Sequence, residues 1–209
     1  MSTLRLTGST SGYTEVTAPA VAGSNTLVLP GGNGTADQAL VTNGSGTLSF
    51  ADRGRMVLST AQNSTSGTSI DFTGIPSWVK RVTVMFDGVS TNGTSFGQIQ
   101  LGDSGGVENT GYTSQFSADS STSAVMTTGL GIFSRPNAAY GFSGLIQIAN
   151  ISGNTWASSG ALAFINVASV CWTSAGSKTL SATLDRVRIT TVNGTDTFDA
   201  GTINILMEG

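Results

Sequence analysis

Few residues of this 209-residue chain have side chains suited to catalysis. The sequence contains no histidine and a single cysteine, which excludes histidine-based triads, cysteine–histidine pairs and the usual zinc sites. Two pairs of carboxylates remain, Asp103 with Glu108 and Asp196 with Asp199. Such a pair could cleave a glycosidic bond or hold Ca²⁺, but neither spacing matches an ion-binding loop. A carboxylate in a turn usually binds its own backbone, so we expect no catalytic residue, no metal site, no cofactor and no enzymatic activity.

The single cysteine, Cys171, cannot form an intrachain disulfide. Its neighbours Val170 and Trp172 are apolar, so we expect a buried small side chain rather than a reactive thiol. Residues 102–106, Gly-Asp-Ser-Gly-Gly, resemble the nucleophile loop of serine proteases. Because no histidine is available as the base, this stretch is better interpreted as a turn.

Two aromatic residues, Tyr112 and Trp156, lie among small polar residues at positions where the sequence predicts loops. An exposed ring beside Asn, Ser and Thr side chains can stack on a sugar while those groups bind its hydroxyls. We therefore name Tyr112 and Trp156 as candidate glycan-binding residues. Burial or packing between subunits is nevertheless favoured over sugar binding for both rings, by about two to one.

The composition indicates a β-rich protein with a hydroxyl- and amide-covered surface. Charged residues make up 10% of the chain, against roughly 25% in an average soluble domain, and this scarcity favours a chain that works inside an assembly. The net charge of −3 argues against binding of nucleic acid. No apolar run is long enough for membrane insertion. The first residues do not form a signal peptide, so we expect a protein that is made in the cytoplasm.

Residues 69–90 contain the densest apolar run and are expected to supply the central strand of the fold. Residues 82–86 alternate with the period of a β-strand, after a turn at residues 74–76. Further short strand-like runs, including residues 161–172, follow between Asn-Gly and Gly-rich turns, and helices should be short or absent. We predict an all-β protein with an antiparallel β-sandwich, jelly-roll-like, over residues 56–209. The side chains expected inside it are Val82, Val84, Phe86, Ile99, Leu101, Ile146, Ile148, Val187, Ile189, Ile203 and Ile205.

Residues 1–55 contain too few apolar residues to enclose a core. Alternating residues and Asn-Gly turns nevertheless predict short β-segments rather than a plain linker. Ordering a residue costs roughly 1–2 kcal/mol, whereas full burial of a leucine returns only about 1.5–3 kcal/mol. We therefore predict that residues 1–55 form an attachment and oligomerisation segment, in which three chains pool their apolar residues. The residues expected to meet there are Leu4, Leu6, Val16, Leu27, Leu29, Leu40 and Leu48.

Several stretches resemble tail-fibre and related virion proteins of tailed bacteriophages, especially those of cyanobacteria and marine bacteria. The N-terminal likeness lies in residues 8–30, 34, 38–40 and 44–50, and the C-terminal likeness in residues 72–86, 100–106, 110–112, 185–191 and 196–208. The resemblance implies a virion protein, in line with the predicted homotrimer, that is attached to other tail or capsid proteins through its N-terminal segment. It carries no catalytic motif, and the chain is short for a tail fibre.

The resulting expectation is a structural virion protein, a short tail fibre that binds a host-surface glycan. The alternative is a capsid fibre or a decoration protein with a mainly mechanical role. A polysaccharide depolymerase is the third reading, disfavoured by the chain length and by the lack of a repetitive β-helix pattern.

Overall fold

The computed structural model describes residues 3–21, 23–36, 38–51, 54–117, 123–133, 137–166 and 171–209. All regular elements in these ranges are β-strands, so the predicted all-β class is confirmed, and none of them includes a helix that could cross a membrane. The chain divides into two compact units, Met1–Arg53 and Gly54–Gly209. The predicted boundary, after residue 55, lies close to this division.

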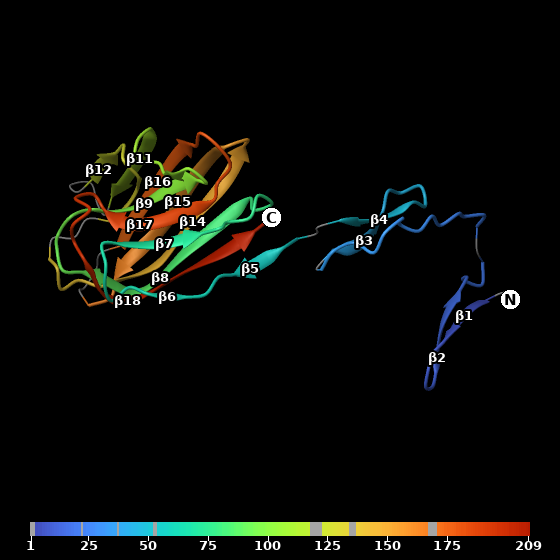
Figure 1. The fold of residues 1–209 in the computed structure, drawn as a ribbon. Helices are drawn as coiled ribbons and strands as arrows, with labels where there is room; N and C mark the ends of the chain where they lie inside the picture. Colours follow the sequence, from blue (N-terminus) through green and yellow to red (C-terminus); the bar gives the residue numbers. More distant parts are fainter. Residues whose placement is uncertain are drawn as a thin grey trace. The chain divides into compact units, whose positions relative to one another are not determined.

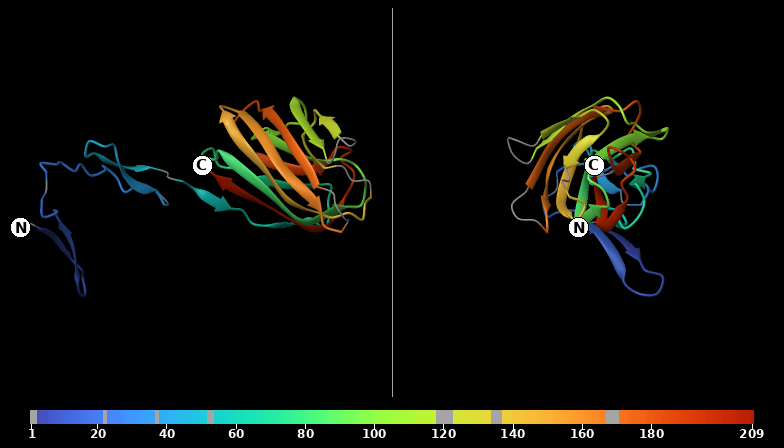
Figure 2. Two further views of the ribbon diagram at one scale, coloured as in Figure 1. Left: turned by 180° about the vertical axis from the view of Figure 1, so that it is seen from behind. Right: turned by 90° about the vertical axis from the view of Figure 1, so that its left-hand side faces the viewer.

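The second unit is a sandwich of two antiparallel sheets that lie face to face (Figures 1 and 2). The smaller sheet has the order β10-β9-β17-β7, with β13 paired to β9. Its strands are β7 (Ser69–Thr73), β9 (Gly97–Asp103), β10 (Gly106–Val107), β13 (Leu130–Phe133) and β17 (Arg186–Thr191). The β-branched residues of β7, β9 and β17 pair directly across the sheet, with Ile189 opposite both Ile70 and Ile99.

The larger sheet has nine strands in the order β12-β11-β16-β15-β14-β8-β18-β5, with β6 paired to β18. Its edges are formed by β5 (Met56–Leu58) and β6 (Gln62–Asn63) on one side and by β11 (Tyr112–Ser117) and β12 (Ser123–Met126) on the other. The long inner strands are β8 (Arg81–Thr91), β14 (Phe142–Ser152), β15 (Thr155–Phe164), β16 (Cys171–Thr179) and β18 (Phe198–Glu208). Because β14, β15 and β16 are consecutive and adjacent, they form a meander.

The core fills the space between the two sheets, as the alternation in the sequence predicted. All eleven side chains expected to face inward are buried, with exposures between 0% and 4%. Val82, Val84 and Phe86 of β8 point into the core. In the sheet, β8 lies between β14 and β18. β8 is therefore an interior strand of the larger sheet, third from its β5 edge.

Three glycines mark a bend that crosses β14, β8 and β18. Gly144, Gly88 and Gly201 have φ angles of 141°, 63° and 94°, and the pairing register shifts beside Gly144 and on either side of Ala200. A Cβ on Gly201 would lie 2.6 Å from the backbone of Gly88. These β-bulges let the long strands curve over the core.

The expected single strand over residues 161–172 is wrong. β15 ends at Phe164 and β16 begins at Cys171, and residues 167–170, including Val170, lie outside the described residues. Leu162 and Trp172 are both buried and stand opposite each other in the β15–β16 pair. The apolar run thus supplies the paired ends of two antiparallel strands. The order of residues along the chain does not distinguish this arrangement from one long strand.

The first unit consists of short strands, as predicted. β1 (Thr3–Thr7) and β2 (Tyr13–Thr17) form one hairpin, and β3 (Ala39–Thr42) and β4 (Leu48–Ala51) form another. In the second hairpin the Asn43 side chain accepts hydrogen bonds from the backbone N–H groups of Ser45 and Thr47, at 2.8 and 3.2 Å. Val28 adds a parallel bridge to Thr47.

Candidate functional site

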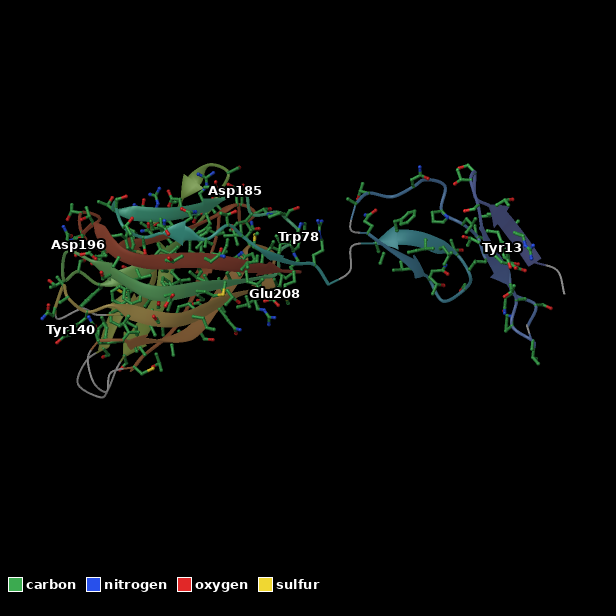
Figure 3. All side chains as sticks on the ribbon, turned by 90° about the horizontal axis from the view of Figure 1, so that it is seen from below. Tyr13, Trp78, Tyr140, Asp185, Asp196 and Glu208 are labelled. Carbon is green, nitrogen blue, oxygen red and sulfur yellow. The ribbon has the colours of Figure 1, made fainter. Side chains whose placement is uncertain are left out.

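One end of the sandwich brings the two candidate aromatic residues into a single row of the larger sheet. Tyr112 of β11 stands opposite Lys178 of β16, which stands opposite Trp156 of β15, which in turn stands opposite Asn150 of β14. This is the end at which the chain enters the unit, because the Arg55 guanidinium lies over Trp78 at 4.9 Å and Gly209 N donates to Arg55 O at 3.0 Å. Figure 3 shows Trp78, Asp185 and Glu208 toward this end, with Asp196 and Tyr140 at the opposite one.

Tyr112 and Trp156 lack the exposure that a glycan-stacking role requires, and the burial that was favoured over this role is confirmed. Tyr112 is 3% exposed and Trp156 is 4% exposed, because both occupy inward-facing positions of strands. The small polar residues around Trp156 belong to β15 itself and alternate between the two faces of the sheet. The structure nevertheless brings the two rings to either side of the same lysine.

Lys178 is the charged centre of the row and is 6% exposed. Its Nζ lies 2.5 Å from Glu108 Oε2, donates to the backbone carbonyl of Thr110 at 2.9 Å and lies 5.3 Å from the centre of the Tyr112 ring. The Tyr112 hydroxyl donates to Glu108 O at 2.8 Å and accepts from Leu101 N at 2.7 Å, and burial raises its pKa. The buried ammonium of Lys178 is tolerated here because it has both an ion pair and a hydrogen bond.

The carboxylates of Asp103 and Glu108 meet at one hydroxyl. Ser181 Oγ lies 2.7 Å from Asp103 Oδ2 and 2.8 Å from Glu108 Oε1. The Ser181 hydroxyl and the Gly105 N–H lower the pKa of Asp103. Partial burial opposes ionisation of Glu108, but hydrogen bonds from Lys178 and Ser181 outweigh it and lower its pKa as well. Both groups are therefore ionised at neutral pH, whereas a glycosidase acid must stay protonated.

The second carboxylate pair is not assembled in this way. Asp196 accepts from Asn193 Nδ2 at 2.6 Å and from Ser95 N at 2.9 Å, which ties two loops together. Asp199 instead accepts from the Ser90 hydroxyl. Within the described ranges no three His, Cys, Asp or Glu side chains lie close enough to hold a metal ion.

Two adjoining hollows open at this end of the sandwich, and Trp156 lines the first of them. The first has a volume of about 270 Å³ and is lined by residues of β14 and β15 and of the segments before β8 and β17. The second, of about 370 Å³, shares Ile75, Ser77, Thr183 and Leu184 with it and reaches Ser104 and Asp185. The buried indole N–H of Trp156 has no hydrogen-bond acceptor among the described residues.

Two neighbouring rows on the outer face of the larger sheet contain no charged side chain. Register places Leu206, Thr83, Gln147, Ser159, Ala175, Gln115 and Val125 in one row across it. The neighbouring row is Asn204, Met85, Leu145, Ala161, Thr173 and Ser117. Cys171 belongs to this outer face and is exposed, so its predicted burial is wrong; it alternates with Trp172, which points inward.

The residues named for oligomerisation lie on the surface of the first unit. Six of the seven are between 53% and 70% exposed in the single chain, and Leu48 is half-buried. In the β1–β2 hairpin, Leu4 pairs with Val16 on the face that also carries Leu6, and Arg5 pairs with Glu15 on the other. That second face has its own contacts, because Arg5 lies 3.3 Å from Glu15 and stacks on Tyr13 at 4.0 Å.

Sequence reasoning missed Lys178 and Ser181. A signal for Lys178 was present, since Trp172, Ser174, Gly176 and Lys178 alternate and share the inward face of β16. Ser181 lies beyond the end of β16, and only the folded chain brings it to Asp103 and Glu108. No pattern in the sequence linked these positions.

Fold and site together define an all-β chain with a well-packed two-sheet sandwich and a smaller unit of hairpins. Searches of known protein families, of curated proteins and of solved structures found no match to this chain.

Proposed function

We propose that this chain is a structural virion protein of a tailed bacteriophage, a short tail fibre whose first unit joins three copies and docks on other virion proteins. The observation that carries the proposal is the uncovered apolar face of the β1–β2 hairpin. Leu4, Leu6 and Val16 are 62%, 57% and 61% exposed on it. The resemblance of both units to phage fibre sequences supports the same reading.

A hairpin of this kind is not stable by itself. Isolated two-stranded hairpins are marginal at best in water, and this one holds only the Arg5–Glu15 pair and the Tyr13 ring on its polar face. Covering three side chains such as Leu4, Leu6 and Val16 contributes about 1.5–3 kcal/mol each. Copies of the same hairpin supply both that cover and partners for the open strand edges.

The sandwich then acts as the displayed head, and its hydroxyl- and amide-rich surface suits a host-surface glycan. The proposal assigns the chain no catalytic step, because the lowered pKa values of Asp103 and Glu108 leave both ionised. The two uncharged rows on the outer face of the larger sheet favour one alternative, a capsid fibre or decoration protein, since a face without charge can pack on a lattice.

Labelling of intact virions with an antibody to the sandwich, read by electron microscopy, tests the proposal. We expect label at the tail, in multiples of three copies by quantitative mass spectrometry. Label spread over the head would favour the decoration alternative, and absence of the chain from purified virions would contradict both.

A further inference from the structure

The outer face of the larger sheet gathers five apolar side chains toward its β5 edge. Met56 and Leu58 of β5 are 65% and 62% exposed, and Leu58 stands opposite Leu206 of β18. Met85 of β8 is the diagonal neighbour of Leu206 and stands opposite Leu145 of β14, which is 45% exposed. Diagonal neighbours in a sheet remain within reach of long side chains. These five residues form one surface, which we call the β5 patch.

The remainder of this face has no comparable surface. The outward positions of β15 and β16 hold alanine, serine and threonine together with Cys171. At the opposite edge of the sheet, Val125 of β12 is 74% exposed and stands opposite the polar Gln115. A single exposed apolar residue such as Val125 is normal, whereas a contiguous apolar patch marks an interaction site.

The strand β5 also has an open backbone edge. It is the last strand of its sheet (Figure 1), and Val57, on the inward side, is still 38% exposed. Arg55 O and Ser59 N each bond to β18 at 3.0 Å. Because bonded and unbonded residues alternate in an antiparallel ladder, the backbone groups of Met56 and Leu58 point away from β18. An apolar edge strand of this kind is a ready contact for another chain.

The charges in the row that contains Met56 neutralise each other. Glu208 and Arg81 follow Met56 in this row, and the Arg81 guanidinium donates two hydrogen bonds to the Glu208 carboxylate, at 2.6 and 2.5 Å. Asp87 follows Met85 on β8, on the side away from the chain-entry end. A second copy of the same chain therefore meets no unpaired like charge in this row, which is the condition for a contact between identical surfaces.

The chain length between the two units limits how far β5 can lie from β4. β4 ends at Ala51 and β5 begins at Met56, and five extended residue steps span at most about 18 Å. In the proposed trimer, Leu48 at the start of β4 meets its copies around an axis. The three β5 strands then begin within this short reach of three neighbouring β4 strands, so other copies are the nearest source of cover for the patch.

We propose that the β5 patch is a second contact between copies of this chain, in which the patch of each sandwich packs against those of the other two. This inference rests on the trimer of the proposed function and extends it from the first unit to the sandwich. Burial of Met56 and Leu58 in each copy removes the largest exposed side chains of the patch from water. The contact also holds the three sandwiches together instead of leaving each on its own tether.

Maleimide labelling of the purified full-length protein, read by mass spectrometry, tests the contact. In a Cys171→Ser background, Leu58→Cys places a thiol in the patch and Val125→Cys places one at the opposite edge of the same face. Leu58 and Val125 are 62% and 74% exposed in the single chain, so the two thiols would react at similar rates if neither were covered. We expect the Leu58→Cys thiol to react at least about tenfold more slowly in the trimer, because a covered thiol reacts only when the contact opens.

Labelling of a dissociated protein separates cover by other copies from cover by the chain itself. When Leu4→Lys is added and light scattering shows a monomer, the Leu58→Cys thiol should react as fast as the Val125→Cys thiol. Equal rates in the intact trimer, or slow labelling of Leu58→Cys that persists in the monomer, would overturn the proposal.

A second pair of variants needs no added thiol. Leu58→Asp places a carboxylate from each copy in the contact and should raise the dissociation constant of the trimer at least about tenfold. Val125→Asp makes the same kind of change outside the patch and should leave that constant unaltered. Both side chains are exposed in the single chain, so neither change buries a charge within the protomer. An equal effect of the two variants would refute the contact.

The outcome is separable from that of the proposed function. A trimer in which Leu58→Cys reacts as fast as Val125→Cys would leave the proposed fibre standing and remove the β5 patch as a contact. Association that survives Leu4→Lys but is lost in Leu58→Asp would do the reverse for the hairpin contact.

Discussion

The two units of this chain use the same secondary structure and differ in what covers their side chains. In the sandwich, Ile146 of β14 is fully buried, whereas Leu4 of the first hairpin is 62% exposed. Both lie on antiparallel strands with complete backbone pairing to a neighbour. Backbone hydrogen bonding therefore does not distinguish the units. We infer that the sandwich is stable by itself, whereas the first unit requires the apolar cover that further copies would supply in the proposed trimer.

The largest expected effect comes from placing a charge in the sandwich core. Val84 is fully buried on β8, between Ile146 and Ile205. In Val84→Asp an unpaired carboxylate would be buried at a cost of about 4 kcal/mol or more, against a total stability of about 5–15 kcal/mol. Circular dichroism should show loss of the cooperative melt. A soluble, cooperatively melting variant would contradict the assigned core.

The same change in the first unit should leave the sandwich intact. Leu6 is 57% exposed in the single chain, so Leu6→Asp buries no charge within the protomer. We expect the melt of the sandwich to change by less than about 0.5 kcal/mol, while sedimentation velocity shows dissociation of the oligomer. If Leu6→Asp unfolds the sandwich, the two units are not independent.

The glycine bend of the sandwich gives the next effect in size. In Gly201→Ala the new methyl group would lie 2.6 Å from the Gly88 backbone, and the alanine backbone would have to keep a φ of 94°. The close contact and the unfavourable φ together cost about 3 kcal/mol. Gly194→Ala is the matched control: its φ is 66° with nothing within 4 Å, so only about 1 kcal/mol of backbone strain is expected. Chemical denaturation measures both, and equal losses would show that the close approach at Gly88 does not matter.

A smaller effect is expected from pH. Asp103 and Glu108 have lower pKa values in the folded chain than when unfolded. The unfolded chain therefore takes up protons first as the pH falls. Their stabilisation is complete above about pH 5, past the unfolded pKa values of about 3.9 and 4.3, and is lost as the pH falls through the lower folded values.

Ser181→Ala removes the hydroxyl shared by Asp103 and Glu108 and tests this pH dependence. The variant should melt about 2–4 °C below the parent at pH 7, and the gap should narrow between pH 5 and pH 3. Calorimetry of both proteins between pH 7 and pH 3 measures this difference in melting temperature. A gap that widens on acidification would mean that the serine does not act through these carboxylates.

The smallest effect is expected at Cys171. Its side chain is exposed on the outer face of the larger sheet, so Cys171→Ser should change stability by less than about 0.5 kcal/mol. The folded parent protein should react with a maleimide at the rate of an exposed thiol. A protected thiol would show that this face is covered, for instance in the oligomer.

The sequence predicted the sandwich well where alternation alone decides which side chains are buried. Val82, Val84 and Phe86 alternate on a strand in the interior of its sheet. Period-two patterning is a direct consequence of strand geometry. Prediction failed where small residues in a strand resembled a loop, as around Trp156. It failed again at Cys171, because the apolar Trp172 beside it points to the other face of the strand.

The candidate site was less accessible to prediction. Tyr112 and Trp156 were named as glycan-binding residues, a role that requires exposed rings, but both rings are buried. The sequence did not indicate that both stand opposite Lys178 in one row. The link from Ser181 to Asp103 joins segments 78 residues apart. Long-range pairing of this kind is set by sheet order, which the linear pattern does not contain.

The mass of the full-length protein in solution tests the central claim, that the first unit is ordered by copies of itself. Light scattering should give three times the 21.2 kDa of one chain, and Leu4→Lys, on the apolar face of the hairpin, should lower it. Thr17→Lys changes the opposite face of the same hairpin and should keep the trimer. A monomeric full-length protein whose first unit is nevertheless protected in hydrogen exchange would contradict the account.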